Sequence, residues 1–142
     1  MFIQKDSDLD VASVMLDLNS TPRISSRAFL KEALDLMDAK KLGIICITDR
    51  FGKLEGIITD GDIRRMLTRV QKPFAALFSD DVIEYSVKNP ITVKRSTALS
   101  DAIATMGLMQ VWDLPVIDQS GKLEGLLHLH PAIEAILGVR NA

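Results

Sequence analysis

The sequence predicts an α/β (α+β) fold made of two tandem β-α-β-β-α repeats that pack as one pseudo-symmetric module. Three observations support this prediction. The pentapeptide GKLEG occurs at 52–56 and again, 69 residues later, at 121–125. Apolar residues with the i, i+3, i+4, i+7 spacing of an amphipathic helix recur at the same offset. Two short apolar runs separated by a Gly-containing turn follow each helix, as in a β-hairpin.

The first helix of each repeat has the most regular apolar pattern. The residues that share its buried face are Leu30, Ala33, Leu34 and Met37 in the first copy, and Leu99, Ala102, Ile103 and Met106 in the second. We therefore expect helices over Ala28–Lys40 and Thr97–Met109. A short strand is expected before each helix, at Arg23–Ser25 and Thr92–Lys94.

The remaining elements follow in the same order in both copies. Each turn begins with Asp and ends with Gly, which suits a positive φ angle. Pro131 suits the first turn of the last helix. The predicted elements are buried strands at Gly43–Thr48 and Leu114–Ile117, second strands at Leu54–Thr59 and Leu123–His128, and final helices at Ile63–Val70 and Ala132–Leu137.

Segments outside the repeat complete the domain organisation. Pro73 is expected to start a short helix at Phe74–Phe78 in the connecting segment. Residues 1–17 have no counterpart in the repeat, and we expect a lead-in helix at Leu9–Leu16. The predicted divisions are a lead-in at 1–17, a first repeat at 18–70, a linker at 71–88 and a second repeat at 89–142.

Composition excludes several classes of function. The formal net charge is −2 without a basic run, so the electrostatic footprint of a nucleic-acid-binding protein is absent. No stretch approaches the roughly 18 apolar residues that indicate a membrane span. The single cysteine, Cys46, lies in the apolar run Leu42–Ile47 and is expected to be a buried core thiol. A cytoplasmic location fits this cysteine usage best.

The junction between the second strand and last helix of the first repeat is unusually polar, with sequence Gly56-Ile-Ile-Thr59-Asp-Gly-Asp62-Ile-Arg-Arg. Asp62 is expected to be a helix N-cap, which alone is worth about 1 kcal/mol. Its carboxylate can also accept hydrogen bonds from the paired hydroxyls of a ribose. The Thr59 hydroxyl, the helix N-terminus and Arg64 or Arg65 could then bind the sugar or a phosphate.

Metal binding is the weaker interpretation of both polar junctions. If Asp60 is position 1 of a calcium loop, position 12 is Gln71, which lacks the carboxylate required there. His128 and His130 are two residues apart, so both could face one side of a strand. No third Cys or His accompanies them, and we expect them to line a second cleft instead.

The two junctions are expected to differ in function. The second copy, GLLHLHPAIEAI at 125–136, keeps the apolar strand and loses both acids and both arginines. Pro131 stands in place of Asp62, so the second cleft lacks an acceptor for a ribose. We expect one nucleotide per chain.

These motifs resemble a known family. Two β-α-β-β-α units, each with D-x-x-G after a buried strand, together with Gly56-Ile-Ile-Thr59-Asp-Gly-Asp62, resemble a pair of CBS domains (a Bateman module). The resemblance covers about residues 9–138. More narrowly, TDGDIRRML and LLHLH resemble the C-terminal half of bacterial arabinose-5-phosphate isomerases. TDGDIRR also occurs in CBS pairs fused to sugar-phosphate nucleotidyltransferases.

The resemblance implies a regulatory module that is not itself an enzyme and carries no cofactor. The regulatory nucleotide would be AMP, ATP or a cytidylyl sugar acid, with the base against Ile24 and Ile45. The parent enzyme would convert arabinose 5-phosphate to ribulose 5-phosphate in the lipopolysaccharide Kdo pathway, and the module would form a homodimer through its helices. A structural oligomerisation module without a ligand is the alternative. The predicted ligand-binding residues are Thr59, Asp60, Asp62, Arg64, Arg65, Ile24, Ile45, His128 and His130.

Overall fold

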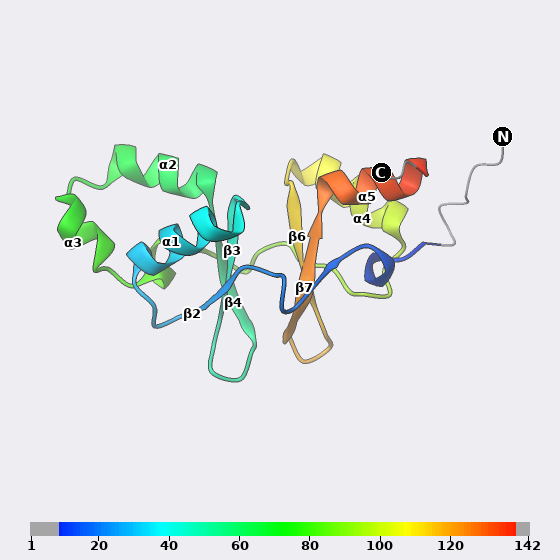
Figure 1. The fold of residues 1–142 in the computed structure, drawn as a ribbon, viewed down its shortest axis with the longest axis horizontal. Coiled ribbons are helices and arrows are strands. Elements are labelled where there is room, and N and C mark those ends of the chain that lie inside the picture. The colour runs from blue at the N-terminus through cyan, green and yellow to red at the C-terminus, as the bar shows by residue number, and fades with distance from the viewer. Residues whose placement is uncertain (1–8, 139–142) are drawn as a thin grey trace. The chain divides into compact units, whose positions relative to one another are not determined.

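The computed structural model describes residues 9–138 (Figure 1). These residues form two compact units. The first-repeat unit is Thr21–Pro90, and the second-repeat unit combines 9–20 with 91–138. Residues 1–8 and 139–142, the ends of the first and last predicted segments, lie outside the described residues.

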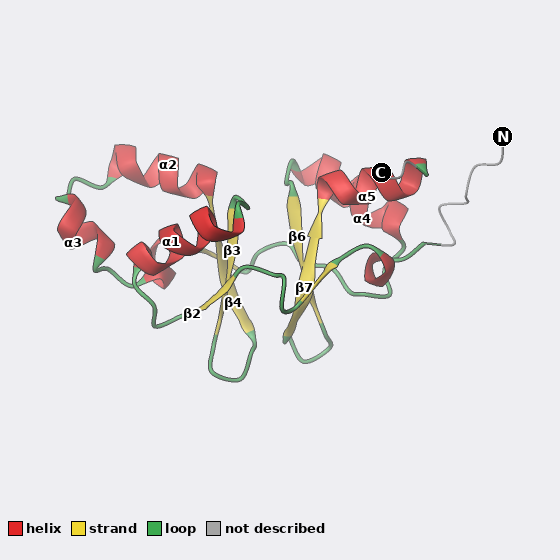
Figure 2. Ribbon diagram, in the orientation of Figure 1, coloured by secondary structure: helices red, strands yellow, loops and turns green. Residues whose placement is uncertain are grey.

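The first-repeat unit contains a four-stranded sheet in the order β2-β3-β4-β5. β2 is parallel to β3, and the other pairs are antiparallel. Helices α1 and α2 lie on one side of the β3–β4 hairpin (Figure 2). The elements are β2 (Arg23–Ser25), α1 (Leu30–Lys40), β3 (Ile44–Thr48), β4 (Leu54–Thr59), α2 (Asp60–Arg69), α3 (Phe74–Phe78), a 3₁₀ helix (Val82–Tyr85) and β5 (Val87–Lys88).

The second-repeat unit contains a three-stranded sheet in the order β1-β7-β6, with both pairs antiparallel. α4 and α5 cover one face of its β6–β7 hairpin. The elements are a 3₁₀ helix (Val11–Ser13), β1 (Leu16–Asp17), α4 (Leu99–Met109), β6 (Asp113–Ile117), β7 (Leu123–His128) and α5 (Leu129–Leu137).

The two cores are built from equivalent residues. In the first-repeat unit the cross-strand pair Ile45 and Ile58 is fully buried against α1 and α2. Leu114 and Leu127 form the equivalent pair in the second-repeat unit, also fully buried. Side chains alternate between the faces of a strand, so these residues fix which face of each hairpin the helices cover. The predicted fold class is confirmed.

The N-terminal segment corrects the sequence prediction. Instead of a helix at Leu9–Leu16, the structure has a 3₁₀ helix followed by the two-residue strand β1. Asp10 ends the extended backbone here, because its carboxylate accepts hydrogen bonds from both the amide and the hydroxyl of Ser13 at 3.1 and 2.8 Å.

This segment also has a counterpart, contrary to the prediction. The Val11 amide donates to the Thr97 carbonyl at 2.9 Å, and the Val82 amide donates to the Ala28 carbonyl at the same distance. Thr97 and Ala28 are equivalent residues of the two repeats, so the lead-in completes the second-repeat unit as 80–88 completes the first.

The last glycine of each GKLEG lies close to the backbone of a neighbouring strand. A Cβ on Gly125 would lie 2.2 Å from the Leu16 carbonyl oxygen of β1. A Cβ on Gly56 would lie 2.9 Å from the Val87 carbonyl oxygen of β5. Glycine therefore lets the short edge strands β1 and β5 pack against the two hairpins.

The other differences from the predicted elements lie at their ends. The expected strand Thr92–Lys94 is reduced to a single parallel bridge between Val93 and Val116. α1 and α4 each begin two residues later than predicted, whereas α2 and α5 each begin three residues earlier. β2, β4, β7 and α3 have the predicted bounds.

Candidate functional site

The β4–α2 junction is organised by a reciprocal capping box. The Asp62 amide donates to Thr59 Oγ1 at 3.2 Å, and Asp62 Oδ2 accepts from the Thr59 amide and hydroxyl, both at 2.9 Å. Thr59 is therefore the N-cap of α2. The prediction that Asp62 is the N-cap is wrong, because the helix already begins at Asp60.

Arg65 closes this junction from the next turn of α2. Its Nη2 donates to Asp62 Oδ1 at 2.9 Å, and a Cβ on Gly61 would lie 3.1 Å from both guanidinium Nη atoms. The guanidinium thus lies over the first turn of the helix. An ionised carboxylate has about four acceptor positions, and Asp62 uses three of them. A ligand hydroxyl can donate to the one remaining acceptor position of Asp62, or it must displace Arg65.

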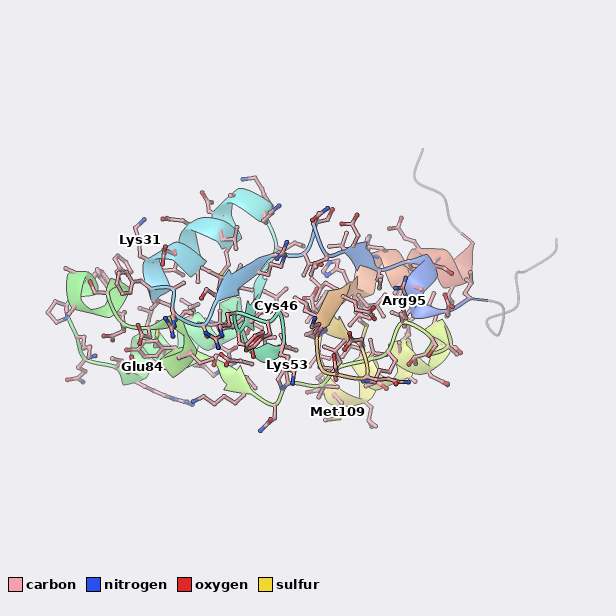
Figure 3. All side chains as sticks on the ribbon, turned by 90° about the horizontal axis from the view of Figure 1, so that it is seen from below. Lys31, Cys46, Lys53, Glu84, Arg95 and Met109 are labelled. Atoms are coloured by element: carbon pink, nitrogen blue, oxygen red, sulfur yellow. The ribbon has the colours of Figure 1, made fainter. Side chains whose placement is uncertain are left out.

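A surface pocket of about 310 Å³ opens beside this junction. One wall is α2, and the other is the 3₁₀ helix and β5, where Glu84 is labelled in Figure 3. All lining residues belong to the first-repeat unit. They are Asp62, Arg65, Met66, Arg69, Val70, Glu84, Tyr85, Ser86 and Val87.

Sequence reasoning missed the second wall and Arg69. The signal for the wall was the pair Asp81-Val82, which matches Asp10-Val11 at an offset of 71 residues rather than 69. That match marks 80–88 as part of the repeated unit, although we assigned it to a linker.

A polar network holds the second wall of the pocket. The Tyr85 hydroxyl donates to Asp80 Oδ2, which also accepts from Lys72 Nζ at 2.7 Å. These two hydrogen bonds hold the pKa of the Asp80 carboxyl below its usual range. The bond to Asp80 raises the pKa of Tyr85, so the phenol stays a neutral donor at neutral pH.

The predicted base-contacting residues do not line this pocket. Ile45 is fully buried in the core of the first-repeat unit, so it presents no surface to a base. Ile24 on β2 packs against the same core. Arg64 and Asp60 are exposed near the junction but are not among the lining residues. The structure thus brings together Asp62 and Arg65, with Thr59 bound to Asp62.

The β7–α5 junction has the same backbone geometry but different side chains. The Leu129 amide donates to the Trp112 carbonyl at 2.9 Å, as the Asp60 amide donates to Gly43 at 3.0 Å. His128 Nδ1 lies 2.7 Å from Asp113 Oδ1, a cross-strand pair equivalent to Thr59 and Ile44. Burial raises the pKa of Asp113 above its usual range, and the His128 hydrogen bond partly offsets this effect.

His128 and His130 do not face the same side of a strand. His128 ends β7, whereas His130 belongs to α5. The His130 side chain is 81% exposed and its Nε2 lies 4.0 Å from Glu134 Oε1. Across residues 9–138, no three His, Cys, Asp or Glu side chains gather where a metal ion could bind.

Residues 10–69 and 82–137 each match the family model of the CBS domain. The chain belongs to the CBS domain family. The first match begins in the lead-in, which belongs to the second-repeat unit, and the second match begins at Val82, which belongs to the first-repeat unit.

One curated CBS relative is the arabinose 5-phosphate isomerase KdsD of Pseudomonas aeruginosa, 31% identical over 132 residues. The match covers 89% of this chain and 38% of KdsD, so the chain spans about two fifths of that enzyme. Arabinose 5-phosphate isomerase GutQ of Salmonella typhi is 25% identical over 126 residues, which cover 89% of this chain and 38% of GutQ.

Among solved structures, CBSX2 in complex with AMP has a TM-score of 0.80 and 26% identity, covering 91% of this chain and 96% of CBSX2. Its CBS-pair fold is shared by this chain. No helix among the described residues is both long and apolar enough to cross a bilayer.

Proposed function

We propose that this chain is a CBS-pair regulatory module that binds one adenosine-type nucleotide at the β4–α2 junction. The observation that carries the proposal is the placement of Asp62 and Arg65 on one pocket, with Thr59 bonded to the same carboxylate. Asp62 would accept the ribose hydroxyls, and Arg65 would turn to a phosphate. The AMP complex of CBSX2 supports this class of ligand.

The module would be the regulatory part of a sugar-phosphate enzyme. The match to KdsD supports an isomerase that converts arabinose 5-phosphate to ribulose 5-phosphate, for which a cytidylyl sugar acid is the second candidate ligand. The other candidate parent enzyme is a sugar-phosphate nucleotidyltransferase to which the module would be fused. The expected location is the cytoplasm.

A homodimer through helices stays part of the proposal. Leu108 and Met109 at the end of α4 are 82% and 50% exposed (Met109 is labelled in Figure 3), and the adjacent Trp112 is 70% exposed. Apolar side chains of this size support an interface on the helical face of the second-repeat unit.

Thermal unfolding in the presence of ligands tests the proposal. AMP, ATP, S-adenosylmethionine and a cytidylyl sugar acid should be added separately to the wild type and to Asp62→Ala. A ligand that binds only the folded chain adds about 2.7 kcal/mol to the free energy of unfolding when its concentration is 100 times its Kd, so the wild-type Tm should rise. Asp62→Ala should show a smaller rise from its own baseline. If none of the four raises the wild-type Tm, the sensor function is lost.

The second candidate is a structural module without a ligand. The capping box favours it, since three acceptor positions of Asp62 are already used within the chain. Under this alternative, Asp62→Ala lowers stability and no compound changes the Tm of either protein.

A further inference from the structure

We propose that the pocket beside α2 selects phosphorylated nucleotides over uncharged and sulfonium nucleosides, and that Arg69 is the residue that makes this selection. The inference rests on the proposed function, because it assigns the chemical class of the ligand at the same site. It adds a residue that lies outside the Thr59–Asp62 motif.

Arg65 and Arg69 form a cationic row along the helical wall. They are four residues apart on α2, so their side chains emerge on the same face of the helix, and both line the pocket. Arg65 is paired with Asp62 at 2.9 Å. In contrast, the Arg69 side chain has no hydrogen-bond or ion-pair partner among residues 9–138. A guanidinium with five donors is therefore available beside the pocket.

Two carboxylates also line the pocket. Asp62 is at the start of α2, and Glu84 is on the opposite wall. The pocket thus pairs two cations along one helix with acceptors at its start and across from it. A nucleoside phosphate fits both sets, since its hydroxyl and amino groups are donors and its phosphate is an anion.

Other adenosine ligands fit only part of this arrangement. Adenosine has the donors but leaves Arg69 without an anion. S-adenosylmethionine places a sulfonium cation next to the ribose, where it would meet the two arginines, and like charges at close range repel. The volume of about 310 Å³ lies at the small end of the range for ligand pockets.

The second repeat shows that the fold does not require these arginines. Glu134 and Gly138 occupy the positions equivalent to Arg65 and Arg69, and α5 still forms beside β7. The cationic row is therefore a property of the first-repeat pocket, and a ligand explains it better than folding does.

Isothermal titration calorimetry with AMP, adenosine and S-adenosylmethionine tests the inference on the wild type, Arg69→Gln and Arg50→Gln. Arg50 is the control, because it is an exposed arginine on the β3–β4 turn of the same unit that does not line the pocket. A hydrogen bond between charged groups at a solvent-exposed site corresponds to about a tenfold change in Kd. We expect Arg69→Gln to weaken AMP about tenfold and to leave adenosine unchanged, whereas Arg50→Gln changes neither.

Wild-type affinity should fall from AMP to adenosine and be lowest for S-adenosylmethionine. The inference alone is overturned if adenosine or S-adenosylmethionine binds as tightly as AMP, or if both arginine variants affect AMP equally. If none of the three ligands binds the wild type, the adenosine-nucleotide site and the inference fail together. Circular dichroism of each variant confirms that a lost calorimetric signal reflects lost binding rather than unfolding.

Discussion

Asp62 has a structural role that is separable from ligand binding. Its carboxylate accepts hydrogen bonds from the Thr59 amide and hydroxyl and from Arg65. We predict that Asp62→Ala lowers the free energy of unfolding by about 1 kcal/mol, as for other helix-capping side chains. Urea unfolding measures this change, and Asp62→Asn is the control, because its amide oxygen retains an acceptor. Equal stability of the alanine variant and the wild type would contradict the capping role.

The raised pKa of Asp113 predicts that stability depends on pH. Its folded pKa is raised by burial, so between the ordinary value of 3.8 and the raised value the folded chain binds more protons than the unfolded chain. The contribution of Asp113 to stability is therefore present below pH 3.8 and is lost as pH rises through the folded pKa. Asn cannot ionise, and its amide oxygen can still accept from His128 Nδ1.

Asp113→Asn should accordingly gain stability relative to the wild type as pH rises from about 3.5, with a plateau above the raised pKa. Urea unfolding of both proteins at several pH values between 3.5 and 6 measures the difference. A difference that stays constant, or that falls with pH, is the opposite result.

At the scale of elements, the two hairpin turns depend on glycine, whereas the middle of helix α4 does not. Gly52 and Gly121 have φ angles of +85° and +89°, which cost other residues about 1 kcal/mol. Gly107 lies within α4, and a Cβ there would meet nothing within 4 Å. We predict that Gly52→Ala and Gly121→Ala each destabilise by about 1 kcal/mol, whereas Gly107→Ala stabilises by about 0.5–1 kcal/mol.

Thermal or urea unfolding of the three glycine variants measures the predicted losses and the predicted gain of stability in one experiment. Gly107→Ala serves as the control for a general effect of an added methyl group. Destabilisation by all three substitutions would show that the φ angle is not the cause.

The repeated elements were predictable because their buried faces recur at a fixed offset. α1 and α4 follow directly from Leu30, Met37 and their equivalents 69 residues later. Helix starts were less predictable, because the capping box at Thr59 depends on side chains that reach back to the backbone. Taking Asp62 as the N-cap placed the start of α2 at Ile63, three residues late.

Residues of the site could be predicted from the sequence only where a single motif contains them. Thr59, Asp62 and Arg65 lie within seven consecutive residues, so the sequence alone indicated them. Glu84 and Tyr85 reach the same pocket through β5, which pairs with β4 by backbone hydrogen bonds that leave no side-chain pattern. Ile45 could not be excluded as a base contact from the sequence, since a strand buried on one face and one buried on both look alike in a short apolar run.

At the scale of the whole molecule, each unit is completed by the segment that precedes the other repeat. Val11 and Val82 are the equivalent anchors, and both are fully buried in the cores of the second-repeat and first-repeat units, respectively. Their offset of 71 residues, against 69 for the rest, explains why the relationship was not apparent from the sequence.

We predict that Val11→Ala and Val82→Ala each cost about 2 kcal/mol, because each leaves a small cavity in a packed core. Native-state amide hydrogen exchange should show the loss of protection in 91–138 for Val11→Ala and in 21–90 for Val82→Ala. Each variant is the control for the other. Loss of protection at 21–90 in Val11→Ala, with 91–138 unchanged, would contradict the assignment of the lead-in to the second-repeat unit.

The central claim is that one nucleotide binds the chain at the β4–α2 junction. The most direct test is to map backbone amide chemical shifts by NMR during a titration with AMP. The account predicts saturable changes concentrated at residues 59–70 and 84–87, with a stoichiometry of one per chain. Changes centred on residues 128–134, or no changes at millimolar AMP, would contradict it.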